Sequence, residues 1–147
     1  MPIKTFRGLI ANGTQDTIVL HTNDGSTGYR IVKFQIMVTE PGEQSSEHTL
    51  KIFSVSQTTI NNTLDFSDQT LLGAGWLGFG ASTGPTNIIV TIFDNMVFNQ
   101  DIYITCSDAS GGVKPCNYYL ELEQVKLDLG ENTVATLKDI RNVTTPI

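Results

Sequence analysis

The sequence predicts an all-β protein: an antiparallel β-sandwich, connected as a jelly roll of about eight strands. Three observations favour this fold. The composition suits strands and turns, several short runs are rich in β-branched and aromatic residues, and turn-forming residues separate these runs. Asn, Thr, Ser and Gly are abundant, whereas charged residues make up only 16% of the 147-residue chain. Helical proteins are richer in Ala, Glu, Lys and Leu.

The expected strands form one domain, residues 1–147, because no repeat or boundary interrupts the chain. Every second residue from Val32 to Val38 is apolar, and this period of two predicts a half-buried strand. The run 87–94 is apolar on both faces, which predicts a strand covered on each side. The expected strands are residues 3–10, 17–22, 29–39, 48–56, 87–94, 101–106 and 116–129.

The last third of the chain contains two irregular patterns. The apolar phase changes within 116–129, and a β-bulge near Glu123 and Gln124 would reconcile its two halves. Between Glu131 and Asn142 the apolar residues recur every three positions, which favours a short C-terminal helix, with a strand as the alternative. The spaced residues are Val134, Leu137 and Ile140.

The stretch Leu71 to Gly80, LLGAGWLGFG, contains the spacing G-x-G-x-x-G. A dinucleotide site needs a helix directly after such glycines, but two more glycines and Pro85 leave no room for one. We therefore predict no cofactor. The segment is expected to be a loop, which either closes one end of the sandwich with Trp76 or docks on a neighbouring subunit. The candidate interface residues are Leu71, Leu72, Trp76, Leu77 and Phe79.

Cys106 and Cys116 flank a short segment rich in Ser and Gly. A hairpin that pairs 106 with 116 would place both cysteines and their apolar neighbours on one face. The two residues are then either free, semi-buried thiols or a cross-strand disulfide. No second Cys or His pair has the spacing of zinc ligands, so we predict no metal site.

Groups with catalytic potential are scattered along the chain. His21 and His48 are isolated in sequence and are expected at the surface or at the rim. The motifs G-x-S-x-G and H-E-x-x-H and the P-loop are absent, so we predict no catalytic residue and no enzyme. A polysaccharide hydrolase is the alternative, and it would need two carboxyl groups in a cleft. The candidate carboxylates are Asp65, Asp68, Asp94, Asp101, Glu121 and Glu123.

The charge and hydropathy of the chain restrict its partners. The net charge is −6 and the nine basic residues are dispersed, which argues against binding of nucleic acid. No apolar run approaches the roughly 20 residues that span a bilayer. The first residues, MPIKTFRGLI, lack the apolar centre of a signal peptide. We expect neither a nucleic-acid partner nor a membrane partner.

Four segments together resemble small virion-associated structural proteins of marine tailed bacteriophages. The resemblance covers about half of the chain, and the segments are DGSTGYRIVKFQIM, VFNQDIYIT, NYYLELEQVKLDL and ENTVATLKDIRN. It implies a structural protein of the phage particle on the capsid exterior. It rests on the residue order of the segments as a whole and not on a catalytic motif, so it assigns no role to any single residue.

Two functions follow as expectations. The first is a capsid decoration or cement protein that forms a homo-oligomer, a trimer, and binds the major capsid protein or other virion proteins. Such a protein would be assembled in the host cytoplasm and would reside in the virion. The second is a carbohydrate- or receptor-binding module of the particle, in which exposed rings such as Tyr103 and Tyr119 stack on a glycan.

Overall fold

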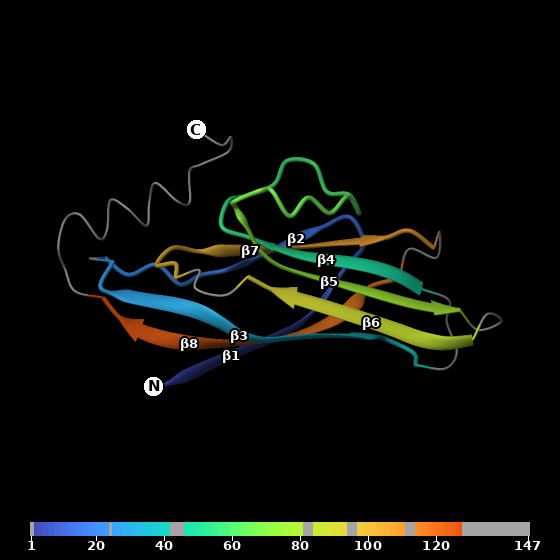
Figure 1. The fold of residues 1–147 in the computed structure, drawn as a ribbon, viewed down its shortest axis with the longest axis horizontal. Helices are drawn as coiled ribbons and strands as arrows, with labels where there is room; N and C mark the ends of the chain where they lie inside the picture. Colours follow the sequence, from blue (N-terminus) through green and yellow to red (C-terminus); the bar gives the residue numbers. More distant parts are fainter. Residues whose placement is uncertain are drawn as a thin grey trace.

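The computed structural model describes residues 2–23, 25–41, 46–80, 84–93, 97–110 and 114–127. These residues form eight β-strands and no helix, packed as two antiparallel sheets (Figure 1). The prediction of an all-β sandwich is confirmed, while the expected helix at 131–142 lies outside the described residues. The strands are β1 (Ile3–Ile10), β2 (Gln15–Ile18), β3 (Thr27–Val38), β4 (Ser46–Phe53), β5 (Leu71–Gly80), β6 (Gly84–Ile92), β7 (Ile102–Asp108) and β8 (Cys116–Lys126).

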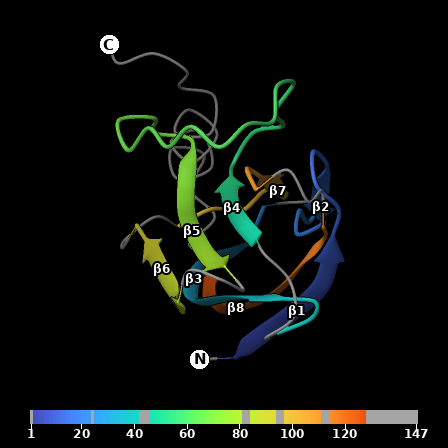
Figure 2. The same cartoon turned by 90° about the vertical axis from the view of Figure 1, so that its right-hand side faces the viewer.

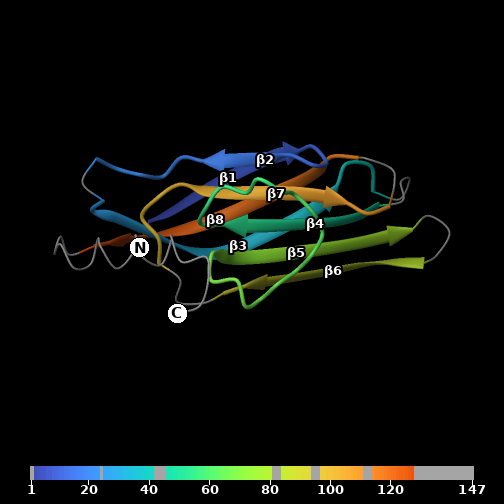
Figure 3. The ribbon, with the colours of Figure 1, turned by 90° about the horizontal axis from the view of Figure 1, so that it is seen from above.

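The strands are distributed so that neighbours in sequence often lie in different sheets. Sheet A has the order β1-β8-β3, and sheet B has the order β2-β7-β4-β5-β6 (Figure 3). The pairs β1–β8, β2–β7 and β4–β5 are nested as in a jelly roll. The remaining nested pair would be β3 with β6, but β6 instead extends sheet B beside β5.

The two long sides of the sandwich consequently differ. On one side, which we call the closed side, the edge strands β1 and β2 are joined by residues 11–14, which cross from one sheet to the other (Figure 2). This crossing segment is bonded to β7: Gly13 N donates to the Cys106 carbonyl at 2.8 Å, and Cys106 N donates to the Thr14 carbonyl at 3.2 Å. On the other side, which we call the open side, the edge strands are β3 and β6.

The core lies between the sheets and is formed by alternate residues of their strands. Leu50, Ile104 and Leu120 are completely buried there, and burial of one such side chain contributes about 1.5–3 kcal/mol. The pairing of β3 with β8 shifts between Ile31 and Lys33. Ile31 therefore faces the core, whereas Val32 is 40% exposed.

This irregularity corrects two expectations. The β-bulge lies in β3 and not near Glu123 and Gln124, where β8 keeps an unbroken register with β1 through Glu123. Val32 was expected to share the buried face of its strand, but the extra residue turns it outward.

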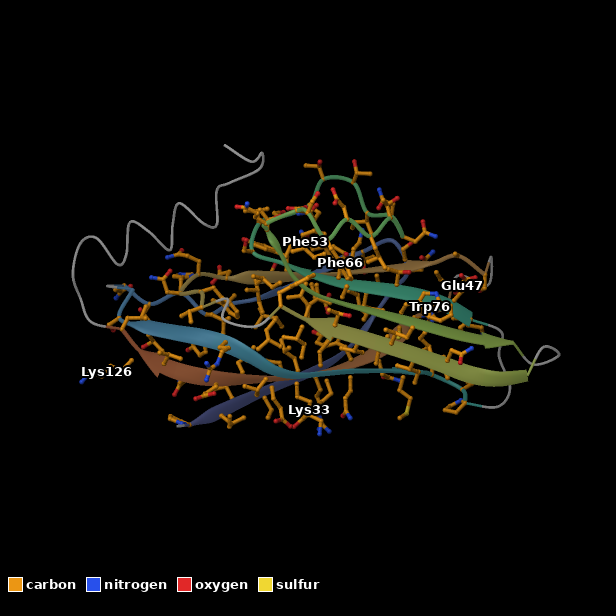
Figure 4. The ribbon with its side chains drawn as sticks, viewed as in Figure 1. Lys33, Glu47, Phe53, Phe66, Trp76 and Lys126 are labelled. Atoms are coloured by element: carbon orange, nitrogen blue, oxygen red, sulfur yellow. The ribbon has the colours of Figure 1, made fainter. Side chains whose placement is uncertain are left out.

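A long connection, residues 54–70, passes over the outer face of sheet B (Figure 1). Lys51 of β4 projects into it, and its Nζ donates to the Asn61 side-chain oxygen at 3.1 Å and to the Thr63 carbonyl at 2.8 Å. Burial lowers the pKa of Lys51, and the charge of Asp68 partly offsets this effect. Figure 4 shows Phe66 of this connection on the side of sheet B, and Lys33 projecting from the opposite surface of the sandwich.

Candidate functional site

The described structure contains a groove of about 650 Å³. Its size lies within the range of about 300–1,000 Å³ that is typical of ligand sites. It is bounded by all three strands of sheet A and, on the open side, by β6. The lining residues are Arg7, Gly8, Phe34, Gln35, Ile36, Met37, Ile88, Val90, Asn117, Tyr118 and Tyr119.

The register of sheet A aligns three of the polar residues that line the groove. Arg7 of β1 and Gln35 of β3 both pair with Tyr119 of β8, which places the three side chains in one row on the outer face. The Tyr119 hydroxyl donates to Glu121 Oε2 at 2.7 Å, and this bond to a carboxylate raises the pKa of Tyr119. A guanidinium, an amide and a phenol therefore lie side by side on the outer face of sheet A.

The neighbouring row, on the core face, consists of Gly8, Tyr118 and Ile36. A Cβ at Gly8 would lie 2.8 Å from the Tyr118 hydroxyl oxygen, so only glycine leaves room for this ring. Tyr118 crosses the sandwich and donates to Asp16 Oδ2 of β2 at 3.1 Å. Burial, together with the nearby Asp16 carboxylate, raises the pKa of Tyr118 to about 12.

The apolar part of the open side is exposed. Met37 of β3 is 61% exposed, and Ile88 and Ile89 of β6 are 51% and 62% exposed. The run 87–94 was predicted to be covered on each side, and this prediction is wrong because β6 is the edge of sheet B. Met37 and Ile88 line the groove, whereas Ile89 points to the opposite face of β6, so exposed apolar side chains make the open side the strongest candidate for contact with a partner.

The segment predicted to dock as a loop is strand β5, hydrogen-bonded between β4 and β6. Leu71, Leu72 and Leu77 are only 1–3% exposed, so their side chains belong to the protomer and do not form an outer contact surface. Trp76 is half-buried on the outer face of sheet B, and the side chain of Phe79 lies outside the described residues. The loop interpretation, and with it the docking role of the leucines, is wrong.

The glycines of this segment permit close packing of side chains against β5. A Cβ at Gly75 would lie 3.1 Å from Ile36 Cδ1 of the facing sheet. A Cβ at Gly78 would lie 2.6 Å from the Trp76 ring, which folds over that position. The motif G-x-G-x-x-G thus marks a strand against which side chains pack directly.

Cys106 and Cys116 are both free thiols and completely buried. The expected hairpin is wrong, because β7 and β8 lie in different sheets: Cys106 pairs with Leu50, and Cys116 pairs with Ile10 and Val38. Burial raises the pKa of each thiol to about 12. Neither cysteine is a reactive nucleophile in this environment.

The two histidines differ in their surroundings. His21 is exposed, as expected, and its Nδ1 lies 2.7 Å from Asp101 Oδ1, which also accepts the backbone N–H groups of Leu20 and His21. Burial alone would raise the pKa of Asp101, but these hydrogen bonds outweigh it and lower the pKa. His48 was expected at the surface or rim, but it is completely buried.

His48 is held by the connection after β7. Its Nε2 donates to the Lys114 carbonyl at 2.8 Å and lies 3.7 Å from Asp108 Oδ2. Its Nδ1 has no hydrogen-bond partner among the described residues. Asp108 organises this region by accepting the backbone N–H groups of Glu47, Ser110 and Lys114.

The remaining carboxylates serve local structure. Asp65 and Asp68 each accept the backbone N–H and the hydroxyl of the residue two positions later, Ser67 and Thr70. Glu123 accepts a hydrogen bond from Arg30 at 2.7 Å. Asp94 lies outside the described residues.

Glu121 and Glu123 share the outer face of sheet A, but neither lines the groove. The aromatic candidates are separated as well, because Tyr119 lies at the groove while Tyr103 is in β7 of the other sheet. The described structure therefore does not unite the predicted carboxylates and rings in one pocket.

Among the described residues, no three His, Cys, Asp or Glu side chains are grouped as metal ligands would be. The same residues contain no helix with the length and hydropathy needed to cross a membrane. A scan against protein-family models and a search of curated proteins each found no match for this chain. Function is therefore inferred from the open side of the sandwich.

Proposed function

We propose that the protein is a structural subunit of a bacteriophage particle, a decoration or cement protein that docks on neighbouring virion proteins through its open side. The observation that carries this proposal is the exposed apolar rim of the groove, formed by Met37 and Ile88. Patches of this kind on a compact domain mark contacts with other proteins. The resemblance of four segments to virion-associated phage proteins supports the choice of assembly.

The experiment that tests this function uses particles of the phage that encodes the chain. The protein is expected in purified virions by mass spectrometry and on the capsid exterior by immunogold labelling. Full-length Met37→Lys, supplied in place of the native protein, should be incorporated at least about tenfold less, because a charge at the rim would be desolvated on docking. Val19→Lys is the matched control, since Val19 is 65% exposed and does not line the groove.

Absence of the protein from purified particles would contradict the proposal, as would equal incorporation of the two lysine variants. Expression of each variant alone and its thermal unfolding curve exclude a folding defect as the cause. Both side chains are well exposed, so both variants are expected to fold.

A second function is favoured by the polar row on the outer face of sheet A. Arg7, Gln35 and Tyr119 present hydrogen-bonding groups beside an aromatic ring, the combination with which proteins bind sugars. The same protein on a glycan array separates this function from the first. A glycan bound by the native chain and lost in Tyr119→Ala, but not in Tyr103→Ala, would favour a receptor-binding module.

A further inference from the structure

Strand β6 is an edge strand with few of the features that protect edges. It pairs with β5 along one side, and its other side is paired with no strand of the described structure. Its sequence, GPTNIIVTI, contains no charged residue. Pro85 protects only its start, which leaves the seven residues 86–92 as an uninterrupted edge.

The other three edges of the sandwich are protected. β1 carries Lys4 and Arg7, and β3 carries Arg30 and Lys33. β2 is only four residues long. Charge and shortness are the usual means by which proteins prevent edge-to-edge pairing, and after Pro85 β6 has neither.

Exposed apolar side chains project from β6 on both faces of the sheet. Ile88 and Ile89 are consecutive, so they point to opposite faces, and each is more than half exposed. A strand added to this edge would cover both side chains at once. An unpaired edge with exposed isoleucines on its two faces is therefore suited to an extended partner.

We propose that the partner is a second copy of this chain, whose β6 pairs antiparallel with β6 across a two-fold axis. This proposal deepens the proposed function, because it supplies the self-association of the subunit. Both copies carry the same net charge of −6, so the contact between them should add no further like-charge repulsion. A two-fold axis sets each edge strand against the same strand of the other copy. Lys and Arg of β1 or β3 would then face like charges, whereas the uncharged β6 avoids this repulsion.

The central residue of the free segment 86–92 is Ile89. Pairing centred there places Ile89 opposite Ile89 and Ile88 opposite Val90, so that the apolar side chains meet. The two five-stranded sheets become one continuous sheet of ten strands. The product is a dimer and not the trimer expected from the sequence.

The affinity expected for this contact determines how it must be measured. Seven paired residues span only about 23 Å, so the interface is smaller than the standard of about 800 Å² per partner. We expect a weak, reversible dimer. Its mass must be followed over a wide range of protein concentration.

The experiment is sedimentation equilibrium of the full chain. The native protein and Val19→Lys are expected to form dimers as concentration rises. Ile89→Lys and Ile89→Glu, each alone, should dimerise at least tenfold more weakly, because each places a charge opposite its own copy. An equimolar mixture of the two variants should regain the dimer, because opposite charges then meet at the same position.

Four results would overturn the proposal: a native protein that stays monomeric, a native trimer, unchanged dimerisation of Ile89→Lys, or a mixture that remains monomeric. Recovery in the mixture also proves that both variants are folded. A native dimer with no protein in purified virions would remove the proposed function and leave this inference intact. A native monomer found on virions would remove this inference and leave the proposed function intact.

Discussion

The two sides of the sandwich solve the problem of a free sheet edge in different ways. On the closed side, the chain itself crosses from β1 to β2, and Tyr118 spans the gap between the sheets to reach Asp16. On the open side, no nested β3–β6 pair forms, and a groove and exposed isoleucines remain. Bonds within the protomer complete the first side, whereas the second retains apolar surface for contacts outside it.

This difference implies that different residues determine the stability of the fold and its association with partners. Substitutions on the closed side and at the connections beside it should lower the free energy of unfolding. Substitutions on the open side should change contacts with partners and leave the fold unchanged. The predictions below test the first half of this separation, in order of decreasing effect.

The largest effect is expected for Asp108→Ala. The Asp108 carboxylate accepts backbone bonds from Glu47, Ser110 and Lys114, and its own N–H donates to the Asn12 side chain near the closed side. Loss of the acceptor should lower the free energy of unfolding by about 3 kcal/mol, measured by urea denaturation. Asp65→Ala removes the same kind of turn from an exposed site and should have no measurable effect.

The acid dependence of stability gives a second measure of the same residue. Burial alone would raise the pKa of Asp108, but the bonds from Ser110, Glu47 and Lys114 outweigh it and lower the pKa. A depressed pKa stabilises the fold above the ordinary value of about 3.9, and this stabilisation is lost as pH falls through the folded pKa. Asp108→Asn should therefore lose less stability than the native chain between pH 5 and 3, a range of about two units. An identical acid profile would contradict this role.

An intermediate effect is expected for Tyr118→Phe. The substitution removes a hydrogen bond to the carboxylate of Asp16 on the closed side, which should cost about 1.5 kcal/mol in chemical denaturation. Tyr119→Phe is the matched control from the next position of β8. Its hydroxyl bonds to Glu121 on the outer face, so no measurable loss is expected. Equal losses in the two variants would show that the bond on the closed side and the bond on the outer face contribute equally to the free energy of unfolding.

The smallest signal is expected from thiol labelling of the native chain, in which almost no thiol should react. Burial raises the pKa of Cys106 to about 12, which reduces the thiolate about a thousandfold from the ordinary thiol. Ellman's reagent at pH 8 should therefore leave Cys106 and Cys116 unmodified until urea unfolds the protein. Met37→Cys adds one thiol to the open side and should react at once. Rapid reaction of the native chain would show that the core opens readily.

The strand pattern was largely predictable, but strand β5 was not. Period two identified most strands, because their core positions carry apolar side chains. In β5, two core-facing positions are Gly73 and Gly75, and the space is filled by Ile52 of the adjacent strand β4 and by Ile36 of the facing sheet. An apolar pattern whose side chains come from other strands cannot be seen in the sequence of the strand itself.

The candidate site could not be predicted from the sequence, for a related reason. The groove and the edge depend on which strands are neighbours, and nothing in the run NIIVTIF distinguishes a central strand from an edge. One missed residue did have a signal: Asp108 precedes Ser110 by two positions, as Asp65 precedes Ser67, a spacing typical of side-chain-bonded turns.

The central strand of sheet A has a consequence for how the chain acquires its fold. β8 lies between β1 and β3, so that Ile3 pairs with Glu123, far along the chain. A growing polypeptide therefore emerges from the ribosome with both outer strands made and nothing to join them. Sheet A forms only after β8 has been synthesised, and we expect the meeting of these distant segments to slow folding.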